Sequence, residues 1–306
     1  MEAQRWDVVV VGGGAAGLSA ALMLGRARRR VLVVDAGAPR NRFAEHMHGV
    51  LGHEGLDPAE LLARGRTEVA EYGVTVTEGV VSRVDDRGDE LAVVGPSDTE
   101  RARAMIVATG MGDELPVVPG LAERWGRSVL HCPYCHGWEV RGRRLGVLVT
   151  SPFGVHQAQL VRQWSEQVVV FAAPETMDSA AEQRLRARDV DIVHDTVVEL
   201  LGTRDRLDGV RTGDGRVVPL DALFTVGVPR PHDGFLAGLD LERADGPMGS
   251  FLAVDATGRT SHERIWAAGN VVNPAANVPM AISAGAFAGA SVNQALVVAE
   301  FDAAQT

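Results

Sequence analysis

The chain is 306 residues long, 46% hydrophobic and 23% charged, which is typical of a globular protein and long enough for two domains. Its net charge of −10 argues against nucleic acid or an anionic membrane as the main partner, and the absence of lysine excludes a P-loop lysine or a lysine Schiff base. No apolar run reaches the length of a membrane span, no signal peptide is visible, and two cysteines are too few for a secreted disulfide scaffold, so a cytoplasmic location is expected.

A strand, a glycine-rich turn and a helix open the chain. Residues 6–11 are an apolar run of the kind that forms a buried parallel strand, and residues 18–24 have helical periodicity. The turn between them reads G-x-G-x-x-G, in which the first glycine allows a tight turn, the second lets the backbone approach a pyrophosphate and the third lets helix and strand pack: Gly12, Gly14 and Gly17. The amino end of the helix then faces the phosphates.

A second strand over residues 30–34 ends at Asp35. An acidic residue about twenty positions after the glycines accepts hydrogen bonds from the ribose of a bound dinucleotide. The strand, the helix and this acid together make the glycine pattern predict dinucleotide binding.

The loop that follows, residues 40–57, lacks periodicity and contains His46, His48 and His53. Three histidines so close together can indicate a metal site. No carboxylate or thiol lies among them at a ligand-like spacing, so we favour a loop beside the cofactor whose histidines line a pocket.

The first domain continues with a helix over residues 58–72, for which Asp57 is a plausible N-cap. Residues 74–84 and 90–94 are predicted as strands of a small antiparallel sheet. Residues 104–109 are predicted as another buried strand.

The two cysteines, Cys132 and Cys135, lie within the sequence H-C-P-Y-C-H-G-W. Two residues separate them, which is the spacing of a redox-active dithiol. A zinc site is a second interpretation because His131 and His136 flank the pair, although structural zinc usually takes its ligands from two separated pairs. Two inert buried cysteines are a third. The redox dithiol is favoured, and it needs an electron partner such as a flavin.

A second α/β unit is predicted to begin after Pro116 and Pro119, and a return linker is indicated by the glycines and proline at 246–249. The helix of this second unit is expected over 153–164, and its strands are expected over 145–150, 168–171, 190–193 and 223–228. A strand and turn at 265–270 and a helix over 279–299 close the chain.

Four motifs in this order resemble the low-molecular-weight thioredoxin reductase family of flavoproteins over nearly the whole chain. They are the glycine turn with Asp35, the Ala-Thr-Gly at 108–110, the cysteine pair, and the Ala-Ala-Gly-Asn at 267–270. The resemblance implies an α/β fold with two Rossmann-like domains, each of three layers (ββα), and a homodimer as the active form. It also implies a discontinuous FAD-binding domain over 1–116 and 246–306, and a middle domain over 117–245.

The resemblance implies FAD as the cofactor and names the residues that contact it. They lie in the glycine turn, after the second strand, at the two later motifs and in the closing helix: Gly12, Gly14, Ala15, Ala16, Gly17, Asp35, Ala36, Arg40, Asn41, Val81, Ala108, Thr109, Gly110, Gly269, Asn270, Met280 and Ala281. The implied catalytic residues are Cys132 and Cys135. His136, beside the pair, is a candidate base on its own chemistry, with a histidine that only caps the turn as the alternative.

The chain departs from the family pattern at three places. The terminal Gly-Asp of the family is Gly269-Asn270 here, and asparagine can still hydrogen-bond the ribityl chain. The acid after the second cysteine is His136. The glycine loop of the middle domain is replaced by T-S-P-F-G-V at 150–155.

The third departure bears on NADPH. Pro152 lacks a backbone N–H, and side chains at 150 and 152 keep the backbone away from a pyrophosphate. Hydrogen bonds to a charged group are each worth about 1.5–3 kcal/mol, so losing two weakens binding by roughly a hundredfold or more. Residues 171–183 contain no cation for a 2′-phosphate. NADPH binding in another way stays an alternative.

The sequence C-P-Y-C-H-G-W-E also resembles the FAD-dependent dithiol oxidases of gliotoxin- and holomycin-type pathways, which lack a working NADPH site. This resemblance implies a small-molecule dithiol as substrate, dioxygen as acceptor and hydrogen peroxide as product. It places Cys135 against the flavin and Cys132 toward the substrate. We expect His136 to accept and return protons, and a pocket above Cys132 to be shaped by Trp138, His46 and His48.

Two other functions stay open. One is a disulfide reductase fed by NADPH, ferredoxin or another flavoprotein. The other is a flavin-bound module with a structural or sensing role, against which the intact cysteine pair argues. The eroded loop at 150–155 separates the oxidase from a reductase fed by NADPH, and it does not exclude ferredoxin.

Overall fold

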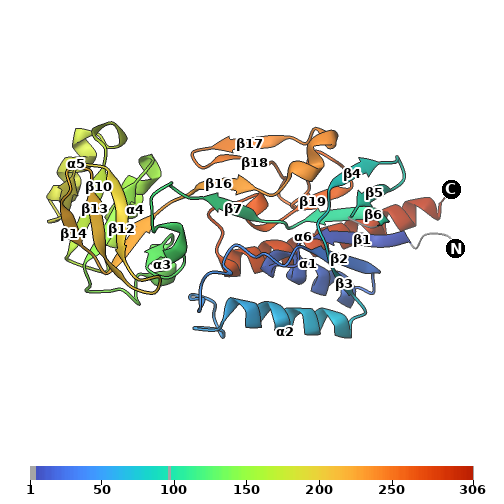
Figure 1. Ribbon diagram of the computed structural model, residues 1–306. Helices are drawn as coiled ribbons and strands as arrows, with labels where there is room; N and C mark the ends of the chain where they lie inside the picture. The colour runs from blue at the N-terminus through green and yellow to red at the C-terminus, as the bar shows by residue number, and fades with distance from the viewer. Residues whose placement is uncertain (1–4, 96–97, 306) are drawn as a thin grey trace. The chain divides into compact units, whose positions relative to one another are not determined.

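The chain passes between two units four times in the computed structural model, which describes residues 5–95 and 98–305 (Figure 1). Unit 1 comprises Met1–Arg42, Asp57–Gly112 and Pro229–Thr306. Unit 2 comprises Phe43–Leu56 and Asp113–Val228. The expected α/β fold with a discontinuous first unit is confirmed, since each unit is built on a sheet with helices on one side.

Two boundaries differ from the expected ones. The return to unit 1 begins at Pro229 and not at residue 246, because the glycines near 246 form the turn of a hairpin between β17 (Arg243–Gly246) and β18 (Gly249–Leu252). The chain returns through β16 (Val228–Pro231), which contains Pro229 and Pro231 and pairs with β7 (Met111–Glu114). The second difference is Phe43–Leu56, which was expected in the FAD domain and belongs to unit 2.

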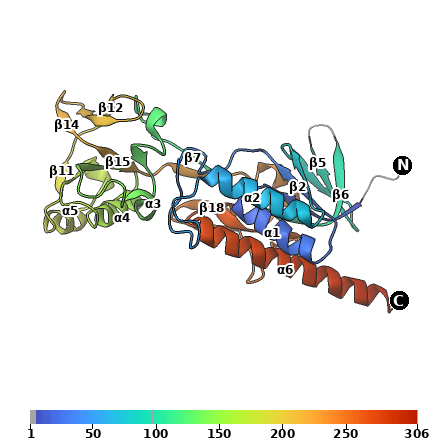
Figure 2. The ribbon, with the colours of Figure 1, turned by 90° about the horizontal axis from the view of Figure 1, so that it is seen from below.

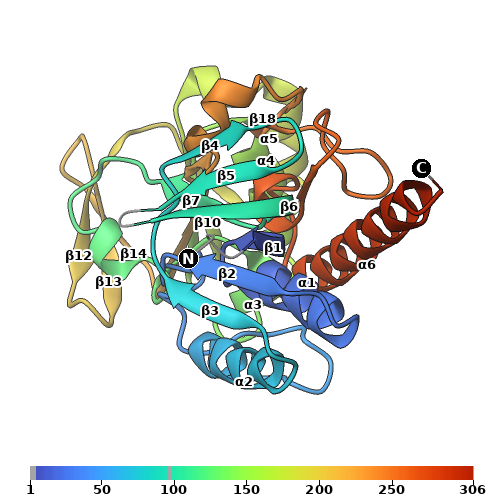
Figure 3. The ribbon, with the colours of Figure 1, turned by 90° about the vertical axis from the view of Figure 1, so that its right-hand side faces the viewer.

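Unit 1 is built on a seven-stranded sheet in the order β3-β2-β1-β6-β5-β4, with β19 also paired to β6 (Figure 3). Strands β3, β2, β1, β6 and β19 run parallel, whereas β4 and β5 form an antiparallel extension. The strands are β1 (Arg5–Val11), β2 (Val31–Asp35), β3 (Thr75–Glu78), β4 (Arg83–Asp86), β5 (Leu91–Val94), β6 (Thr99–Val107) and β19 (Ile265–Ala267).

The single strand expected over 74–84 is therefore wrong. Its first part is β3, a parallel edge strand beside β2, and its last part is β4, which pairs antiparallel with β5. Strand β6 is longer than predicted because it serves both arrangements. Its amino-terminal half pairs with β5 and its carboxyl-terminal half with β19.

Three helices cover one face of this sheet: α1 (Ala15–Arg26), α2 (Pro58–Glu71) and α6 (Val278–Ala303). Figure 2 shows them side by side, with α1 between the other two. Because side chains alternate along a strand, Val8 and Val10 of β1 pack under the helices while Val9 and Val11 enter the core on the other face. The short 3₁₀ helices of unit 1 are η3 (Gly234–Leu239) and η4 (Gly269–Val271).

Helix α6 packs along α1 through two glycines four residues apart. A Cβ at Gly285 would overlap the carbonyl of Ala16, and one at Gly289 would lie 2.6 Å from the carbonyl oxygen of Ala20. Contrary to the expectation from sequence, α6 is, by length and composition, an apolar helix long enough to cross a bilayer, the one such helix in the described residues. Its glycine face is docked on α1, and 28% of its most apolar window is buried, so the helix packs on unit 1 by one face.

Unit 2 is built in three layers. A parallel sheet in the order β11-β10-β9-β15-β8 packs against helices on one face and against an antiparallel sheet, β12-β13-β14, on the other. The strands are β8 (Val129–Leu130), β9 (Leu145–Val149), β10 (Val168–Ala172), β11 (Asp191–Val193), β12 (Val197–Gly202), β13 (Leu207–Thr212), β14 (Val217–Pro219) and β15 (Ala222–Thr225). The helices are η1 (Ala122–Arg124), α3 (Pro133–His136), α4 (Pro152–Val161), η2 (Pro174–Thr176) and α5 (Ser179–Arg186).

Candidate active site

The glycine turn between β1 and α1 leaves room for a phosphate. Gly12 has a φ of +104°, and a Cβ there would overlap the Ala108 carbonyl. A Cβ at Gly17 would overlap the Gly12 carbonyl, so helix and strand meet as predicted. Gly14 differs, because nothing lies within 4 Å of its Cβ position and no side chain caps α1 there. The N–H groups of the first turn, at Ala15 and Ala16, thus lie at an open helix end that suits a pyrophosphate.

Asp35 contacts the glycine turn directly. Its Oδ1 accepts a hydrogen bond from the Gly13 N–H at 3.1 Å, and its Oδ2 accepts one from Nη2 of Arg66 at 2.6 Å. Sequence patterns gave no sign of Arg66, which reaches Asp35 from α2. A ribose hydroxyl would therefore share this carboxylate with Arg66.

Two later motifs come to the same turn. Gly269, at the start of η4, has a φ of +80°, and a Cβ there would lie 3.1 Å from that of Ala16. The hydroxyl of Thr109 is buried and has no hydrogen-bond partner in the described part of the chain. A buried orphan hydroxyl beside an open phosphate cradle fits a bound dinucleotide, because such a group is costly unless a partner satisfies it.

Asn270 uses its side chain to hold the loop before α6. Its Nδ2 donates to the carbonyl oxygens of Asn273 at 3.0 Å and Ala276 at 2.9 Å. Arg40 donates to the carbonyl oxygen of Pro274 in the same loop at 3.4 Å. A carboxylate at position 270 could not donate these bonds, so the asparagine has a structural reason of its own.

The other predicted cofactor residues lie on elements around this turn. The loop after β2 carries Ala36 and Asn41, and Val81 is buried between β3 and β4. Gly110 has a φ of +67° before β7. Met280 and Ala281 belong to the first two turns of α6, where Ala281 packs against the core under the helices. Their contacts with a cofactor stay predictions.

The cysteine pair stands at the start of α3. Cys132 and Cys135 form a disulfide, so neither is a zinc ligand here. Cys132 is the N-cap of the helix, and its Sγ accepts a hydrogen bond from the Cys135 N–H at 3.2 Å. Pro133 occupies the first helical position, where its fixed φ favours the turn. The local sequence therefore builds a tight turn that presents both sulfurs together.

His136 ends this helix and is largely buried. Burial lowers its pKa, the carboxylate of Glu139 acts against that lowering, and His48 adds to it. Its Nδ1 has no hydrogen-bond partner among residues 5–95 and 98–305. A neutral imidazole next to a disulfide can accept a proton from an incoming thiol.

The segment Phe43–Leu56 brings His48 to this helix. Its Nε2 lies 3.5 Å from Oε1 of Glu139, and its Nδ1 lies 2.7 Å from Oε1 of Glu54. A Cβ at Gly126 would lie 2.7 Å from the Cβ of Phe43. The start of the segment therefore packs against the rest of unit 2, Asp113–Val228. Glu54, next to His53 in the sequence, thus holds the imidazole of His48 within the segment.

The predicted pocket above Cys132 is not established by these contacts. His46 bonds within its own segment, with Nδ1 3.1 Å from the Gly55 carbonyl oxygen. Trp138 is 65% exposed, and the guanidinium of Arg141 lies over its ring, 4.0 Å from the centroid. The pocket remains a prediction, although His48 does reach the residues that follow the cysteine pair.

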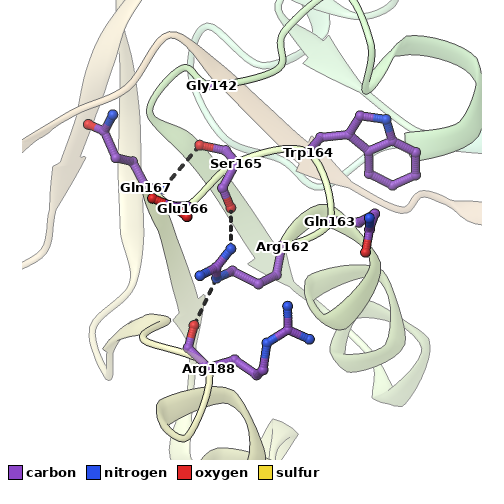
Figure 4. Close-up of a pocket in the computed structure, with 8 residues that line it drawn as sticks. All are labelled: Gly142, Arg162, Gln163, Trp164, Ser165, Glu166, Gln167 and Arg188. Carbon is purple, nitrogen blue, oxygen red and sulfur yellow. Dashed lines mark hydrogen bonds between the residues drawn. The ribbon is translucent and has the colours of Figure 1, made fainter.

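Unit 2 has a surface pocket of about 380 Å³ beside the end of α4 (Figure 4). Arg162 crosses it, donating from Nε to the Arg188 carbonyl and from Nη1 to the Ser165 carbonyl. The ring of Trp164 meets that of Tyr134 of α3 edge to face, with centroids 5.7 Å apart. The pocket is lined by Gly142, Arg162, Gln163, Trp164, Ser165, Glu166, Gln167 and Arg188. None of these eight was predicted as a site residue.

The turn of unit 2 that corresponds to the glycine turn of unit 1 is closed differently. Thr150 donates its hydroxyl to the Val226 carbonyl at 3.3 Å, and α4 begins at once with Pro152. A Cβ at Gly154 would lie 3.0 Å from the Cα of Val149, so this glycine serves the packing of helix on strand. The turn thus keeps the packing glycine and lacks the two that admit a pyrophosphate.

The region after β10 is acidic. Asp178 caps α5, and Glu182 on that helix pairs with Arg186 at 2.8 Å and with His194 at 3.2 Å. These bonds lower the pKa of Glu182, which stays ionised. Arg186 and His194 are therefore both paired with the carboxylate of Glu182.

Comparisons with known proteins agree with this architecture. The family model of pyridine nucleotide-disulphide oxidoreductases matches residues 6–288. Thioredoxin reductase tcpT of Claviceps purpurea is 30% identical over 300 residues, covering 92% of each chain. Thioredoxin reductase sirT of Leptosphaeria maculans is 31% identical over 312 positions, covering 94% of this chain and 93% of that protein.

Two solved structures match nearly the whole chain. The crystal structure of HlmI superposes with a TM-score of 0.93 at 43% identity, covering 98% of this chain and 95% of that one. That of a putative thioredoxin reductase TrxB from Bacillus anthracis has a TM-score of 0.88 at 27% identity, covering 96% and 99%. With its glycine turn, orphan hydroxyl and disulfide in place, the chain belongs to the pyridine nucleotide-disulphide oxidoreductase family, as a thioredoxin reductase-like flavoprotein whose cofactor is FAD.

Proposed function

We propose that this flavoprotein is a dithiol oxidase that closes a disulfide in a small molecule and passes the electrons to dioxygen. One dithiol and one dioxygen become one disulfide and one hydrogen peroxide, so two electrons and two protons move. The observation that carries the proposal is the turn at residues 150–155, where Thr150 and Pro152 replace the glycines of a dinucleotide site.

That turn favours electron entry from the substrate side. Pro152 has no N–H to donate, and the hydroxyl of Thr150 is bonded to a strand carbonyl. Residues 171–183 hold no cation for a 2′-phosphate, and the carboxylates of Glu175 and Asp178 in that stretch would repel one. A flavin enzyme without a nicotinamide site must receive its electrons from another donor, and the half-buried disulfide of Cys132 and Cys135 can receive them from thiols.

The FAD contacts follow from unit 1. FAD, when bound, takes up the two electrons that a dithiol gives. We assign its pyrophosphate to the open amino end of α1 at Gly14, Ala15 and Ala16, its ribose to Asp35, and a further contact to the Thr109 hydroxyl.

The chain's own residues account for the thiol chemistry. A substrate thiol gives its proton to His136, and its sulfur attacks Sγ of Cys132. A new sulfur–sulfur bond forms there as the bond to Cys135 breaks, and the electron pair leaves on Cys135. The second substrate thiol then releases its proton to water, and its sulfur attacks the substrate sulfur of the mixed disulfide and displaces Cys132 as a thiolate. The product disulfide is released, and two electrons remain on the cysteine pair.

The test compares two reductants. The protein with FAD should consume dioxygen and form peroxide when given a suitable small dithiol. Without oxygen, the dithiol should bleach the flavin and NADPH should leave it oxidised. Cys135→Ser should lose reduction by the dithiol, whereas exposed Ser82→Ala should keep it. Rapid bleaching by micromolar NADPH would overturn the oxidase and restore a reductase, and failure of both reductants would favour a ferredoxin-fed enzyme.

We also propose that the enzyme is a homodimer and works in the cytoplasm, with neither nucleic acid nor a membrane as partner. The support for a dimer is the outward face of α6, where large apolar side chains are exposed at helical spacing: Met280, Phe287, Val297, Val298 and Phe301.

A further inference from the structure

A buried glutamine of α4 contacts the residue that precedes the cysteine pair. Gln157 lies on the buried face of α4 with Gly154 and Val161, and it is only 2% exposed. Its Nε2 donates a hydrogen bond to the carbonyl oxygen of His131 at 2.5 Å. His131 comes directly before Cys132, so Gln157 holds the peptide group through which the chain enters the disulfide turn.

The side-chain amide of Gln157 is only half satisfied. Its Oε1 is buried and has no hydrogen-bond partner among residues 5–95 and 98–305. A buried polar atom without a partner is costly, and an apolar side chain of similar size would avoid that cost. The other buried residues of α4 are Gly154, Ala158 and Val161. The bond to His131 is therefore the structural reason for a polar side chain at position 157.

A second contact lies on the other side of α3. A Cβ at Gly137, which follows α3, would lie 2.6 Å from Cδ2 of Trp164, so the Trp164 ring lies directly against this glycine. Trp164 follows the end of α4 (Figure 4), and its ring also meets the edge of Tyr134. Helix α4 is itself packed closely on β9 through Gly154. One docked helix and the residue beyond it thus contact the disulfide turn at both of its ends.

The other hydrogen bonds of the turn are internal to it. The carbonyl oxygen of Cys132 accepts from the N–H groups of Cys135 and His136, both at 3.1 Å, and its Sγ accepts from the Cys135 N–H at 3.2 Å. A helix of four residues is too short to be stable alone, so once the disulfide opens the turn depends on contacts from outside it. The contacts made by Gln157 and Trp164 do not involve the sulfur atoms.

We propose that Gln157 and Trp164 are positioning residues that keep Cys132 close to Cys135 when the disulfide is open. Gln157 acts through the His131 carbonyl and Trp164 through Gly137. Two thiols that are held near each other close a disulfide more readily, because less conformational entropy is lost on closure. This rests on the part of the proposed function in which the pair opens and closes during turnover.

The experiment equilibrates the FAD-loaded protein with glutathione redox buffers in the absence of oxygen. Two glutathione thiols become one glutathione disulfide, and the Cys132–Cys135 disulfide takes up the two electrons and two protons. Alkylation and mass spectrometry give the ratio of protein disulfide to dithiol, and absorbance gives the state of the flavin. Gln157→Met should lower that ratio in a given buffer by roughly tenfold, which corresponds to about 30 mV.

Matched controls separate positioning from damage to the fold. Gln159→Met changes an exposed glutamine of the same helix and should leave the ratio unchanged. Val161→Ala removes packing from the buried face of α4, so it should lower the urea midpoint without moving the ratio. Trp164→Leu keeps the bond of Gln157 and should lower the ratio, and it decides the test if Gln157→Met does not fold. An unchanged ratio in the folded variants, or an equal fall in Val161→Ala, would overturn the proposal.

Dioxygen takes no part in this equilibrium, so the two proposals can fail separately. Ratios that shift as expected, in a protein that never consumes dioxygen with a dithiol, would overturn the oxidase alone. Dioxygen turnover by a Gln157→Met protein whose ratio equals that of the wild type would overturn this inference alone.

Discussion

Asn270 shows how a single side chain can change its task while the backbone around it stays the same. The related reductases have an aspartate at this position, as the resemblance implies. Here the amide donates to the carbonyls of Asn273 and Ala276 and so holds the loop that leads into α6. Asn270 therefore stabilises this loop through its amide nitrogen, independently of any contact between its oxygen and the cofactor.

We expect Asn270→Asp to weaken FAD binding, although it restores the family residue. Two hydrogen bonds of about 0.5–1.5 kcal/mol each are lost, and a carboxylate then faces carbonyl oxygens. The dissociation constant of FAD from the apoprotein, followed by flavin fluorescence, should rise by roughly tenfold. Asn293→Asp is the control, since Oδ1 of Asn293 only accepts from Arg29. Equal or tighter binding by Asn270→Asp would contradict this account.

The sequence predicts those site residues whose roles are local. Gly12, Gly14 and Gly17 stand at fixed positions relative to a strand and a helix, and the cysteines are separated by the two residues of one helical turn. The partners of these residues come from elsewhere. Arg66 reaches Asp35 from α2, and His48 reaches Glu139 from a distant segment. The spacing of these residues along the sequence therefore does not indicate either pair.

At the scale of elements, α6 is fixed at its far end by an ion-pair cluster. Glu300 accepts from Nη2 of Arg29 at 3.2 Å and from Nη1 of Arg103 at 2.6 Å, and Arg103 also reaches Asp7 of β1 at 3.1 Å. Arg29 and then Arg103 lower the pKa of Glu300 to about 2. The last turns of α6 are thereby tied to the segment that follows α1 and to strands β1 and β6 of the sheet.

This cluster predicts a pH-dependent effect. Because the pKa of Glu300 falls from 4.5 to about 2 on folding, its contribution to stability is present above pH 4.5 and is lost as the pH falls toward 2. Glu300→Gln should lower the free energy of unfolding by about 1 kcal/mol at neutral pH, a modest value because the carboxylate is partly exposed. The difference in urea midpoint between variant and wild type should shrink below pH 4.5.

Glu60→Gln, which breaks only an exposed pair with Arg64 within α2, is the control and should show little effect at any pH. A midpoint difference for Glu300→Gln that is the same at acid and neutral pH would show that lost packing, and not charge, is responsible.

Elements were predicted where apolar residues are frequent and regular. Helix α5 was missed because it buries only Leu185, which leaves no periodicity to detect. The sheet β12-β13-β14 was missed because its strands are short and irregular; β12 and β13 shift register twice against each other. Strands of a parallel sheet buried on both faces, such as β1 and β9, are continuous apolar runs and were found.

At the scale of the whole molecule, the proposed dimer makes a separate prediction. Phe287→Ser combined with Phe301→Ser removes two of the largest exposed apolar side chains of α6 and should give a monomer in sedimentation velocity. Neither residue lies on the glycine face that docks on α1, so folding should be retained. Val217→Ser, an exposed apolar residue of β14, is the control. A monomeric wild type, or a double variant that remains dimeric, would show that this face is not the interface.

The division into units could be predicted only in outline. The turn near Gly246 and the crossing at Pro229 contain the same residue types, and only the strand pairing of β17 with β18 tells them apart. The membership of Phe43–Leu56 depends on where Phe43 and His48 pack, which is a property of the folded chain.

The membership of Phe43–Leu56 also dictates an order of events during synthesis. This segment leaves the ribosome long before Asp113–Val228, the rest of its unit. It therefore cannot pack in its final position until Asp113–Val228 has been synthesised. Unit 1 waits longer still, because α6 follows all of Asp113–Val228 in the chain. For the same reason, a chimaera that exchanges the middle domain between relatives must also exchange Phe43–Leu56. Otherwise the residues after the transferred cysteine pair lack their contact with His48.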